Sequence, residues 1–303
     1  MDDRRRHPSE QRDPPQPVGI IAGSGRLPFL VANGVRQQGR PLVVVGLAGH
    51  ASPRLKYLAD QFAWAGVTRP SKWISTLRRG GVHEAVMIGG VRKKAIYSPR
   101  RLLRYIPDLR AVRIWYFRLR KDKRDNAVLL AVADELRSEG IEMVSSVKYC
   151  TEHLADEGLM TKTPIPRAAE RDVEFGWRIA RASAELDIGQ SIAVKERDIV
   201  AVEAMEGTDA MIRRAGRVCR VGGWTMVKVA RPKQDMRFDV PTVGPNTISN
   251  LRDAKCICLV VETGRTLIVD KSTTLALADR VGVAVVGKRA EGTTGLPGGG
   301  VGK

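Results

Sequence analysis

Residues 18–39, VGIIAGSGRLPFLVANGVRQQG, open with a short apolar run, pass through a glycine turn and continue with helical periodicity. This order predicts a buried strand, a tight turn and a helix with Pro28 in its first turn, where no backbone donor is needed. The pattern recurs in apolar runs at 41–49 and 84–91, which flank an amphipathic segment at 71–82. Continuous apolar strands that alternate with helices are typical of a parallel sheet covered on both faces.

The remainder of the chain predicts a second α/β domain. A helix at about 126–139 and a strand at 141–144 complete the first domain. Further helices are predicted at 170–186, 209–215, 245–254 and 271–281, with strands at 190–194, 199–204, 224–229, 256–262, 266–269 and 282–287. We therefore expect a disordered tail (1–17), a Rossmann-like N-terminal domain (18–150), a linker (151–166), a C-terminal α/β domain with a mixed sheet (167–288) and a flexible tail (289–303).

Composition argues against several classes of protein. The chain has 303 residues, 43% of them hydrophobic, and no apolar run approaches the roughly 18 to 20 residues of a membrane span. Its start is charged and Pro-rich, unlike a secretory signal, so we expect a cytoplasmic protein. Four histidines and four cysteines form no zinc-ligand spacing, and the thiols at Cys256 and Cys258 fit a buried strand.

Positive charge is concentrated in one stretch. The formal net charge is +18, and residues 98–124 hold ten Lys or Arg against two Asp, together with four aromatic residues. Such a stretch can bind an anionic membrane surface, nucleic acid or a phosphorylated ligand, and it can equally be a solvated basic face.

Two glycine turns follow apolar strands in the first domain. One contains Gly23, Ser24 and Gly25; the other contains Gly89 and Gly90 and leads into three basic residues. Backbone N–H groups in such turns can approach a phosphate, although many α/β turns need glycine for geometry alone. Pro28 breaks the G-x-G-x-x-G pattern, so a nicotinamide cofactor is only weakly supported.

Acidic residues gather at one predicted strand-to-helix turn. Glu203, Glu206 and Asp209 lie within seven residues, with Thr208 among them. Carboxylate oxygens suit Mg²⁺, which takes one or two of them together with waters and phosphates. The alternative is that Thr208 or Asp209 only caps the helix.

A Pro- and Gly-containing loop at 228–247 mixes acids with bases. Asp235 and Asp239 stand among Lys228, Arg231, Lys233 and Arg237. Acids beside bases fit a site for metal and phosphate, and a surface loop with balanced charges is the alternative.

Taken in order, these motifs resemble the LpxI-type UDP-2,3-diacylglucosamine pyrophosphatases. The matching segments are IAGSGRLP, MIGGVRK, LDIGQS, VEAMEGTDAM, KVARPKQDMRFDVPTVG and ETGRTLIVD, and they span about residues 18–287. The resemblance implies a Mg²⁺-dependent hydrolase of lipid A biosynthesis, which splits UDP-2,3-diacylglucosamine into UMP and 2,3-diacylglucosamine 1-phosphate. It places the catalytic carboxylate at Asp239.

The resemblance also suggests which residues bind the metal and the substrate. Metal ligands are expected at Glu206, Asp209 and Asp239. Substrate contacts are expected at Gly23, Ser24, Gly25, Gly89, Gly90, Asp125, Gln190, Thr208, Lys228, Arg237 and Thr242. The expected partners are the acylated UDP-sugar and, peripherally, the anionic inner membrane; nucleic acid is less favoured, and a homodimer stays open.

One departure from the family keeps other functions in view. Where the family often has G-D-D, this chain has Arg124, Asp125 and Asn126, which removes one acid. The alternatives are a catalytically weakened homologue that binds anionic membrane or nucleic acid through residues 98–124, and a nucleotide-sugar oxidoreductase built on the glycine turn. Acids at 203, 206, 209 and 239 favour the hydrolase over both.

Overall fold

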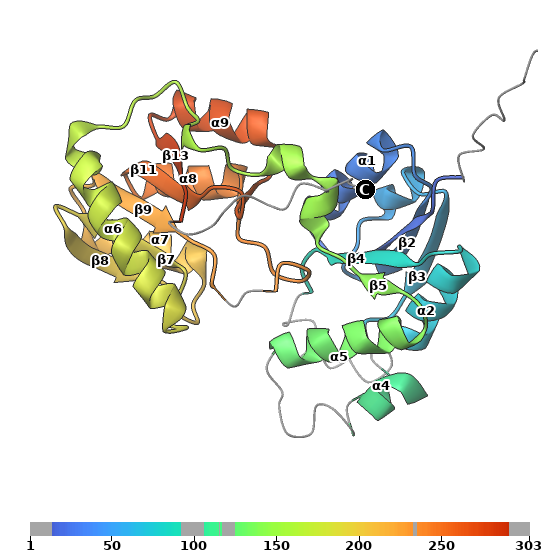
Figure 1. Cartoon of the computed structure of the whole chain (residues 1–303). Coiled ribbons are helices and arrows are strands. Elements are labelled where there is room, and N and C mark those ends of the chain that lie inside the picture. The colour runs from blue at the N-terminus through green and yellow to red at the C-terminus, as the bar shows by residue number, and fades with distance from the viewer. Residues whose placement is uncertain (1–13, 92–105, 115, 117–124, 233–234, 291–303) are drawn as a thin grey trace, which may run out of the picture. The chain divides into compact units, whose positions relative to one another are not determined.

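The structure, a computed structural model, describes residues 14–91, 106–114, 116, 125–232 and 235–290. The chain forms two compact units, Met1–Val144 and Ser145–Lys303 (Figure 1). The first contains a parallel sheet and the second a mixed sheet, both with helices, so the predicted α/β class is confirmed. None of the helices in the described ranges is long and apolar enough to cross a membrane.

The first unit is built on five parallel strands in the order β3-β2-β1-β4-β5. These are β1 (Val18–Ala22), β2 (Leu42–Leu47), β3 (Gln61–Ala65), β4 (Glu84–Ile88) and β5 (Glu142–Met143). The helices are α1 (Leu27–Gln37), α2 (Pro70–Arg79), α4 (Leu109–Ile114) and α5 (Asp125–Ser138), and a 3₁₀ turn, η1, covers Pro53–Tyr57. Sequence analysis missed β3, an edge strand whose residues are mostly half-buried or exposed and lack a clear apolar pattern.

The second unit has six strands in the order β6-β13-β11-β9-β7-β8. β9 (Trp224–Lys228), β11 (Cys256–Glu262) and β13 (Ala284–Lys288) are parallel, whereas β6 (Gly158–Leu159) and β7 (Ser191–Lys195) run against their neighbours. β8 (Asp198–Val202) forms an antiparallel hairpin with β7. A separate parallel pair joins β10 (Thr242–Val243) to β12 (Leu267–Ile268).

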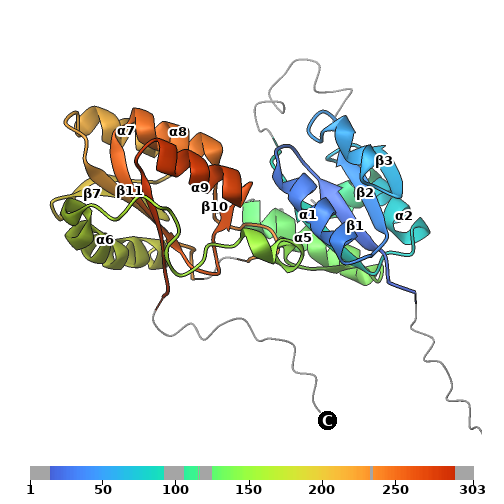
Figure 2. The ribbon, with the colours of Figure 1, turned by 90° about the horizontal axis from the view of Figure 1, so that it is seen from above.

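Helices cover both faces of this mixed sheet, as Figure 2 shows. α6 (Arg167–Glu185) packs on one face through an apolar cluster that includes Val173 and Trp177. α7 (Thr208–Val218), α8 (Pro245–Asp253) and α9 (Lys271–Arg280) cover the other face, where Met211 and Leu251 are buried. Cys256 and Cys258 belong to different clusters because a register irregularity in β11 separates them.

The segment predicted as a linker, 151–166, belongs instead to the second unit. It contains a 3₁₀ turn, η5 (Thr151–His153), and β6, which pairs with β13. The Ala155 N–H donates to the Thr266 carbonyl, and a Cβ at Gly287 would lie 1.7 Å from the Asp156 carbonyl oxygen. The segment is therefore packed as an edge of the sheet. Another 3₁₀ turn, η4 (Ser146–Tyr149), precedes it.

In the second unit, several strands end on the same side of the sheet, and the polar residues that follow them lie there together. β8, β9, β11 and β13 all end there, and β7 begins there because it runs the opposite way. α7, α8 and α9 begin at the same side because each returns the chain to the start of the next central strand. We call this side the carboxyl edge. In open α/β sheets, ligands bind at the edge where the strands end.

Candidate active site at the carboxyl edge

Three side chains form a row across neighbouring strands at the carboxyl edge. Ser191 opens β7 and pairs in register with Lys228, the last residue of β9. Glu203 follows β8, and its N–H donates to the Ser191 carbonyl at 2.8 Å. Lys228 is 3% exposed and Glu203 is 7% exposed. The row therefore places a buried cation and a buried anion on either side of a hydroxyl.

Thr208, the first residue of α7, connects the two charges. Lys228 Nζ donates to Thr208 Oγ1 at 2.9 Å and to Ser191 Oγ at 3.3 Å. Thr208 Oγ1 in turn donates to Glu203 Oε1 at 2.9 Å. An ammonium can only donate and an ionised carboxylate can only accept, so the direction of each hydrogen bond in this chain is fixed.

Among the described residues, the ammonium of Lys228 is in contact with hydroxyl groups. Burial lowers its pKa, and the negative charges of Glu203, Asp239 and Asp209 act in the opposite direction. Within the described ranges, no carboxylate forms an ion pair with it; its hydrogen bonds go to hydroxyls. A buried cation with two neutral partners retains an N–H for an anionic ligand, and phosphate is such a ligand.

Gly189 brings the LDIGQ segment against Glu203. A Cβ at position 189 would lie 1.7 Å from the Glu203 carbonyl oxygen, so only glycine permits this approach. The next residue, Gln190, accepts the Val229 N–H on its carbonyl, while its buried Oε1 has no hydrogen-bond partner in the part of the chain that the structure describes. The structure thus brings Gln190, Thr208 and Lys228 to one edge.

Asp239 stands at the end of a turn that Asp235 organises. The Asp235 carbonyl accepts the N–H groups of Phe238 and Asp239, and its carboxylate pairs with Arg237 at 2.7 Å. The hydrogen bond from Arg237 lowers the pKa of Asp235. Asp239 itself is exposed, and its charge acts on Lys228.

Arg237 and Thr242, two predicted substrate contacts, form hydrogen bonds within this loop. The guanidinium of Arg237 is bound to Asp235 and lies 5.1 Å from the ring centre of Phe238. Thr242 Oγ1 donates to the Val240 carbonyl at 2.8 Å. Both side chains therefore shape the loop that presents Asp239.

The three carboxylates predicted as metal ligands do not assemble as expected. Glu206 is paired with Arg214 and accepts the Ala204 N–H; hydrogen bonds from its own backbone and from Arg214 lower its pKa. Asp209 is exposed and accepts from Asn250 Nδ2 at 2.9 Å. Among the residues described, no three His, Cys, Asp or Glu side chains are grouped to hold a metal ion. In this structure Glu206 is paired with Arg214 on the following helix, and its role as a metal ligand stays a prediction.

We expect Glu206→Gln to leave kcat unchanged, because this side chain is held by Arg214 rather than facing the ligand. Steady-state assays of the purified variant would measure this. A large loss of kcat, with an unaltered melting temperature, would mean that Glu206 leaves Arg214 to act on the substrate.

The glycine turns of the first unit bind each other. The N–H of Ser24 donates to the Gly90 carbonyl, and the N–H of Gly90 donates to the Ser24 carbonyl. Ser24 Oγ also donates to the Gly90 carbonyl, and a Cβ at Gly23 would lie 2.7 Å from Gly89. Gly25, with φ 102°, has open space beside it. The glycines at 23 and 89 are therefore explained by close approach of two turns, and Gly25 keeps room for a ligand.

The predictions for the Asp125 side chain and for most of the basic stretch 98–124 fall outside the residues that the structure describes. α5 begins at Asp125. Of the ten basic residues in the stretch, Arg110 and Arg113 form ion pairs with Glu135 on α5. These two are therefore structural in the first unit.

Sequence analysis missed two residues that shape the site. Ser191 was not singled out because a small residue before an apolar strand is common. Its position directly after Gln190 was the available signal. Glu262, at the end of β11, is 1% exposed and accepts the Ala230 N–H at 2.8 Å, which fixes the chain as it leaves β9. An acid that ends an otherwise apolar strand was the available signal.

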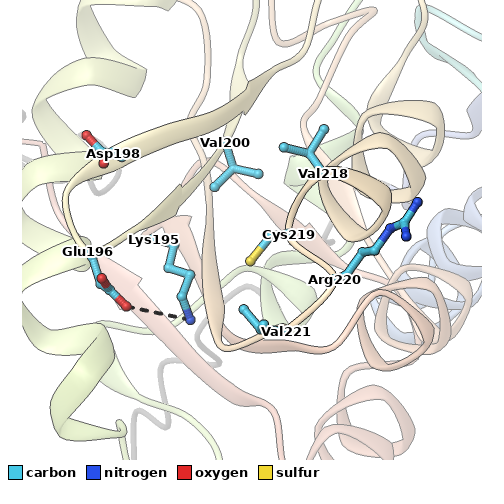
Figure 3. A pocket seen from close by; sticks show the side chains of 8 residues that line it. All are labelled: Lys195, Glu196, Asp198, Val200, Val218, Cys219, Arg220 and Val221. Atoms are coloured by element: carbon cyan, nitrogen blue, oxygen red, sulfur yellow. Dashed lines mark ion pairs between the residues drawn. The ribbon is translucent and has the colours of Figure 1, made fainter.

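A pocket at the β7–β8 hairpin lies away from these residues (Figure 3). It is lined by Lys195 and Asp198 from the hairpin, by Val218 at the end of α7, and by Cys219 and Val221 after it. Lys195 and Asp198 lie where β7 ends and β8 begins, so the pocket is at the opposite end of these strands from the carboxyl edge. It contains none of the predicted site residues.

Comparisons with known proteins match both units of the chain to one family. The family model described as "LpxI N-terminal domain" matches residues 17–153, and the one described as "LpxI C-terminal domain" matches residues 156–286. The chain is also similar to "UDP-2,3-diacylglucosamine pyrophosphatase LpxI" of Caulobacter vibrioides. The two are 32% identical over 283 residues, which cover 89% of this chain and 96% of that protein.

Proposed function

The chain belongs to the LpxI family, and on that premise we propose that it hydrolyses the pyrophosphate bond of UDP-2,3-diacylglucosamine, giving UMP and 2,3-diacylglucosamine 1-phosphate. The substrate comes from the name of the Caulobacter relative. The observation that carries the proposal is Lys228, a buried ammonium at the carboxyl edge whose hydrogen-bond partners, in the part of the chain that the structure describes, are hydroxyls. Such a group is suited to a phosphate oxygen.

The start of α7 supports the same assignment. Gly207 precedes the helix, and no side chain caps it, so first-turn N–H groups of α7 can receive an anion beside Lys228. Asp239, exposed near Lys228, would orient the attacking water and accept its proton. Lys228 and the N-terminus of α7 would stabilise the negative charge that develops on the leaving phosphate.

Magnesium is proposed on the chemistry of the donor set. Asp209 and Asp239 are both exposed carboxylates whose charges act on Lys228, and two such groups are enough for Mg²⁺ when substrate phosphates supply further oxygens. Bound there, the ion would lower the repulsion between the phosphates and an attacking water. Glu206 is paired with Arg214 in this structure, and its role as a ligand stays a prediction.

The test is product identification with purified protein. Incubation with UDP-2,3-diacylglucosamine and Mg²⁺, followed by mass spectrometry, should give UMP and the sugar 1-phosphate in equal amounts. EDTA should stop the reaction, and added Mg²⁺ should restore it. UDP and free sugar as products, or full activity in EDTA, would contradict the reaction or the metal requirement respectively. A catalytically weakened binding protein is not favoured, because the Caulobacter relative, 32% identical over 89% of this chain, is named as a pyrophosphatase.

We also propose peripheral association with anionic membrane through the basic stretch 98–124. Each Lys or Arg near an anionic surface contributes roughly 1 kcal/mol, and salt screens the attraction. Co-sedimentation should therefore be strong with vesicles containing phosphatidylglycerol and should fall as salt rises. Equal binding to neutral vesicles, or binding to duplex DNA alone, would contradict this. Homodimer formation stays a prediction.

A further inference from the structure

Glu203 carries a feature that its local packing does not require. One oxygen, Oε1, accepts from Thr208, but the other, Oε2, is buried and has no hydrogen-bond partner among the described residues. An unsatisfied buried acceptor destabilises the folded state, more so when it is charged. In the described part of the chain, the buried, unpartnered Oε2 of Glu203 therefore destabilises the fold locally, which is typical of a residue retained for the site.

The link from Glu203 to the site runs through a single hydroxyl. The Thr208 hydrogen is directed at Glu203 Oε1, so the Thr208 oxygen can only accept from Lys228. Ser191 Oγ receives a second N–H of the ammonium. With two of its three N–H groups held, Lys228 has one direction left for the third.

We propose that Glu203 is a positioning residue for Lys228, which it orients toward a substrate phosphate through the Thr208 hydroxyl. This inference rests on the proposed function and extends it to a residue that is not expected to touch the substrate. With a neutral amide at 203, the hydrogen bond from the Thr208 hydroxyl is no longer charge-assisted, and Lys228 is held less firmly in its direction. The geometry of phosphate binding then deteriorates although the lysine remains.

The variants separate orientation from packing. Glu203→Gln keeps the shape and removes the charge, Thr208→Val keeps the shape and removes the hydroxyl, and Thr208→Ser retains the hydroxyl. Glu196→Gln, at the far end of the β7–β8 hairpin, is the matched control. Each substitution is made in the wild type and in Lys228→Met, and kcat, KM and melting temperature are measured.

In the wild type, Glu203→Gln and Thr208→Val should each lower kcat/KM by about 10- to 100-fold, the usual effect of losing a group that orients a ligand-binding residue. Thr208→Ser, which keeps the hydroxyl, should lose much less than Thr208→Val, and Glu196→Gln, outside the site, should stay near the wild-type value. In the Lys228→Met protein, Glu203→Gln and Thr208→Val should cause no further loss, because residues that act as one unit are not additive. The melting temperature of Glu203→Gln should fall, because the buried Lys228 then lacks its nearest compensating charge; the comparison with the Lys228→Met background separates this loss of stability from the loss of orientation.

Two results would overturn the inference while leaving the proposed function intact. One is an equal loss from Glu203→Gln with and without Lys228; the other is a loss in Thr208→Ser as large as in Thr208→Val. If the wild type does not cleave the substrate, the proposed function fails, and calorimetry with inorganic pyrophosphate decides the positioning claim. Binding kept by Thr208→Ser and lost by Thr208→Val supports it, and equal binding by both overturns it.

Discussion

Replacing Asp239 by alanine should reduce kcat by about 10² to 10⁴-fold, the contribution expected of a residue that takes the proton from the nucleophile. The side chain is exposed, and the turn that Asp239 ends is held by backbone N–H groups that donate to the Asp235 carbonyl. Its removal should therefore leave folding intact. Substrate affinity should be retained or improved, because one negative charge near the pyrophosphate is gone.

Asp253→Ala is the matched control for this experiment. Asp253 is an exposed aspartate on α8 that pairs with Arg252 on the surface. Its loss should alter neither kcat nor the melting temperature noticeably. Wild-type turnover by Asp239→Ala would remove this residue from the mechanism, whereas a collapsed melting temperature would make it a structural residue of the loop.

The second large effect is expected at Lys228. Lys228→Met keeps most of the side-chain volume and should lower kcat/KM by about 10² to 10³-fold, as the loss of a donor to developing negative charge does in other enzymes. The melting temperature should fall, because removing Lys228 leaves the buried Glu203 without its compensating charge; kcat/KM is therefore measured well below the unfolding transition.

Lys195→Met provides the comparison for Lys228. Lys195 ends β7 at the opposite edge and donates to the Gly222 carbonyl at 2.7 Å. Its loss should leave turnover unchanged. If both variants behaved alike, the carboxyl edge would have no special part in phosphate binding.

Much of the fold was predictable because it depends on local pattern. β1 and β11 were predicted at their observed bounds, since each is an uninterrupted apolar run next to glycine or charged residues. The strand-to-helix turn before α7 was predicted for the same reason. Continuous burial of the central strands leaves a clear signal in sequence.

Edge elements were not predictable in this way. β3 and β6 have exposed or half-buried residues, and their strand character comes from pairing with a distant neighbour. Such pairing depends on residues far apart in the sequence, so the composition of a few neighbouring residues does not predict the strand. The segment containing β6 therefore had the composition of a linker.

Sequence reasoning singled out candidate site residues but could not give their contacts. Thr208, Lys228 and Asp239 were identified by residue type and position, and the structure brings the first two into hydrogen-bond contact. Sequence proximity could not show that Glu206 would turn to Arg214 while Glu203 faced inward. Side-chain direction at a turn is set by which partner the following helix presents, and the acids alone do not reveal it.

A crystal structure with bound 2,3-diacylglucosamine 1-phosphate tests the central claim most directly. The account predicts the phosphate at the carboxyl edge of the second unit, with an oxygen within about 3 Å of Lys228 Nζ, the usual length of a charge-assisted hydrogen bond. Asp239 should face the same phosphate. A product phosphate bound elsewhere, for example in the pocket of Figure 3, with Lys228 still bonded only to Thr208 and Ser191, would contradict it.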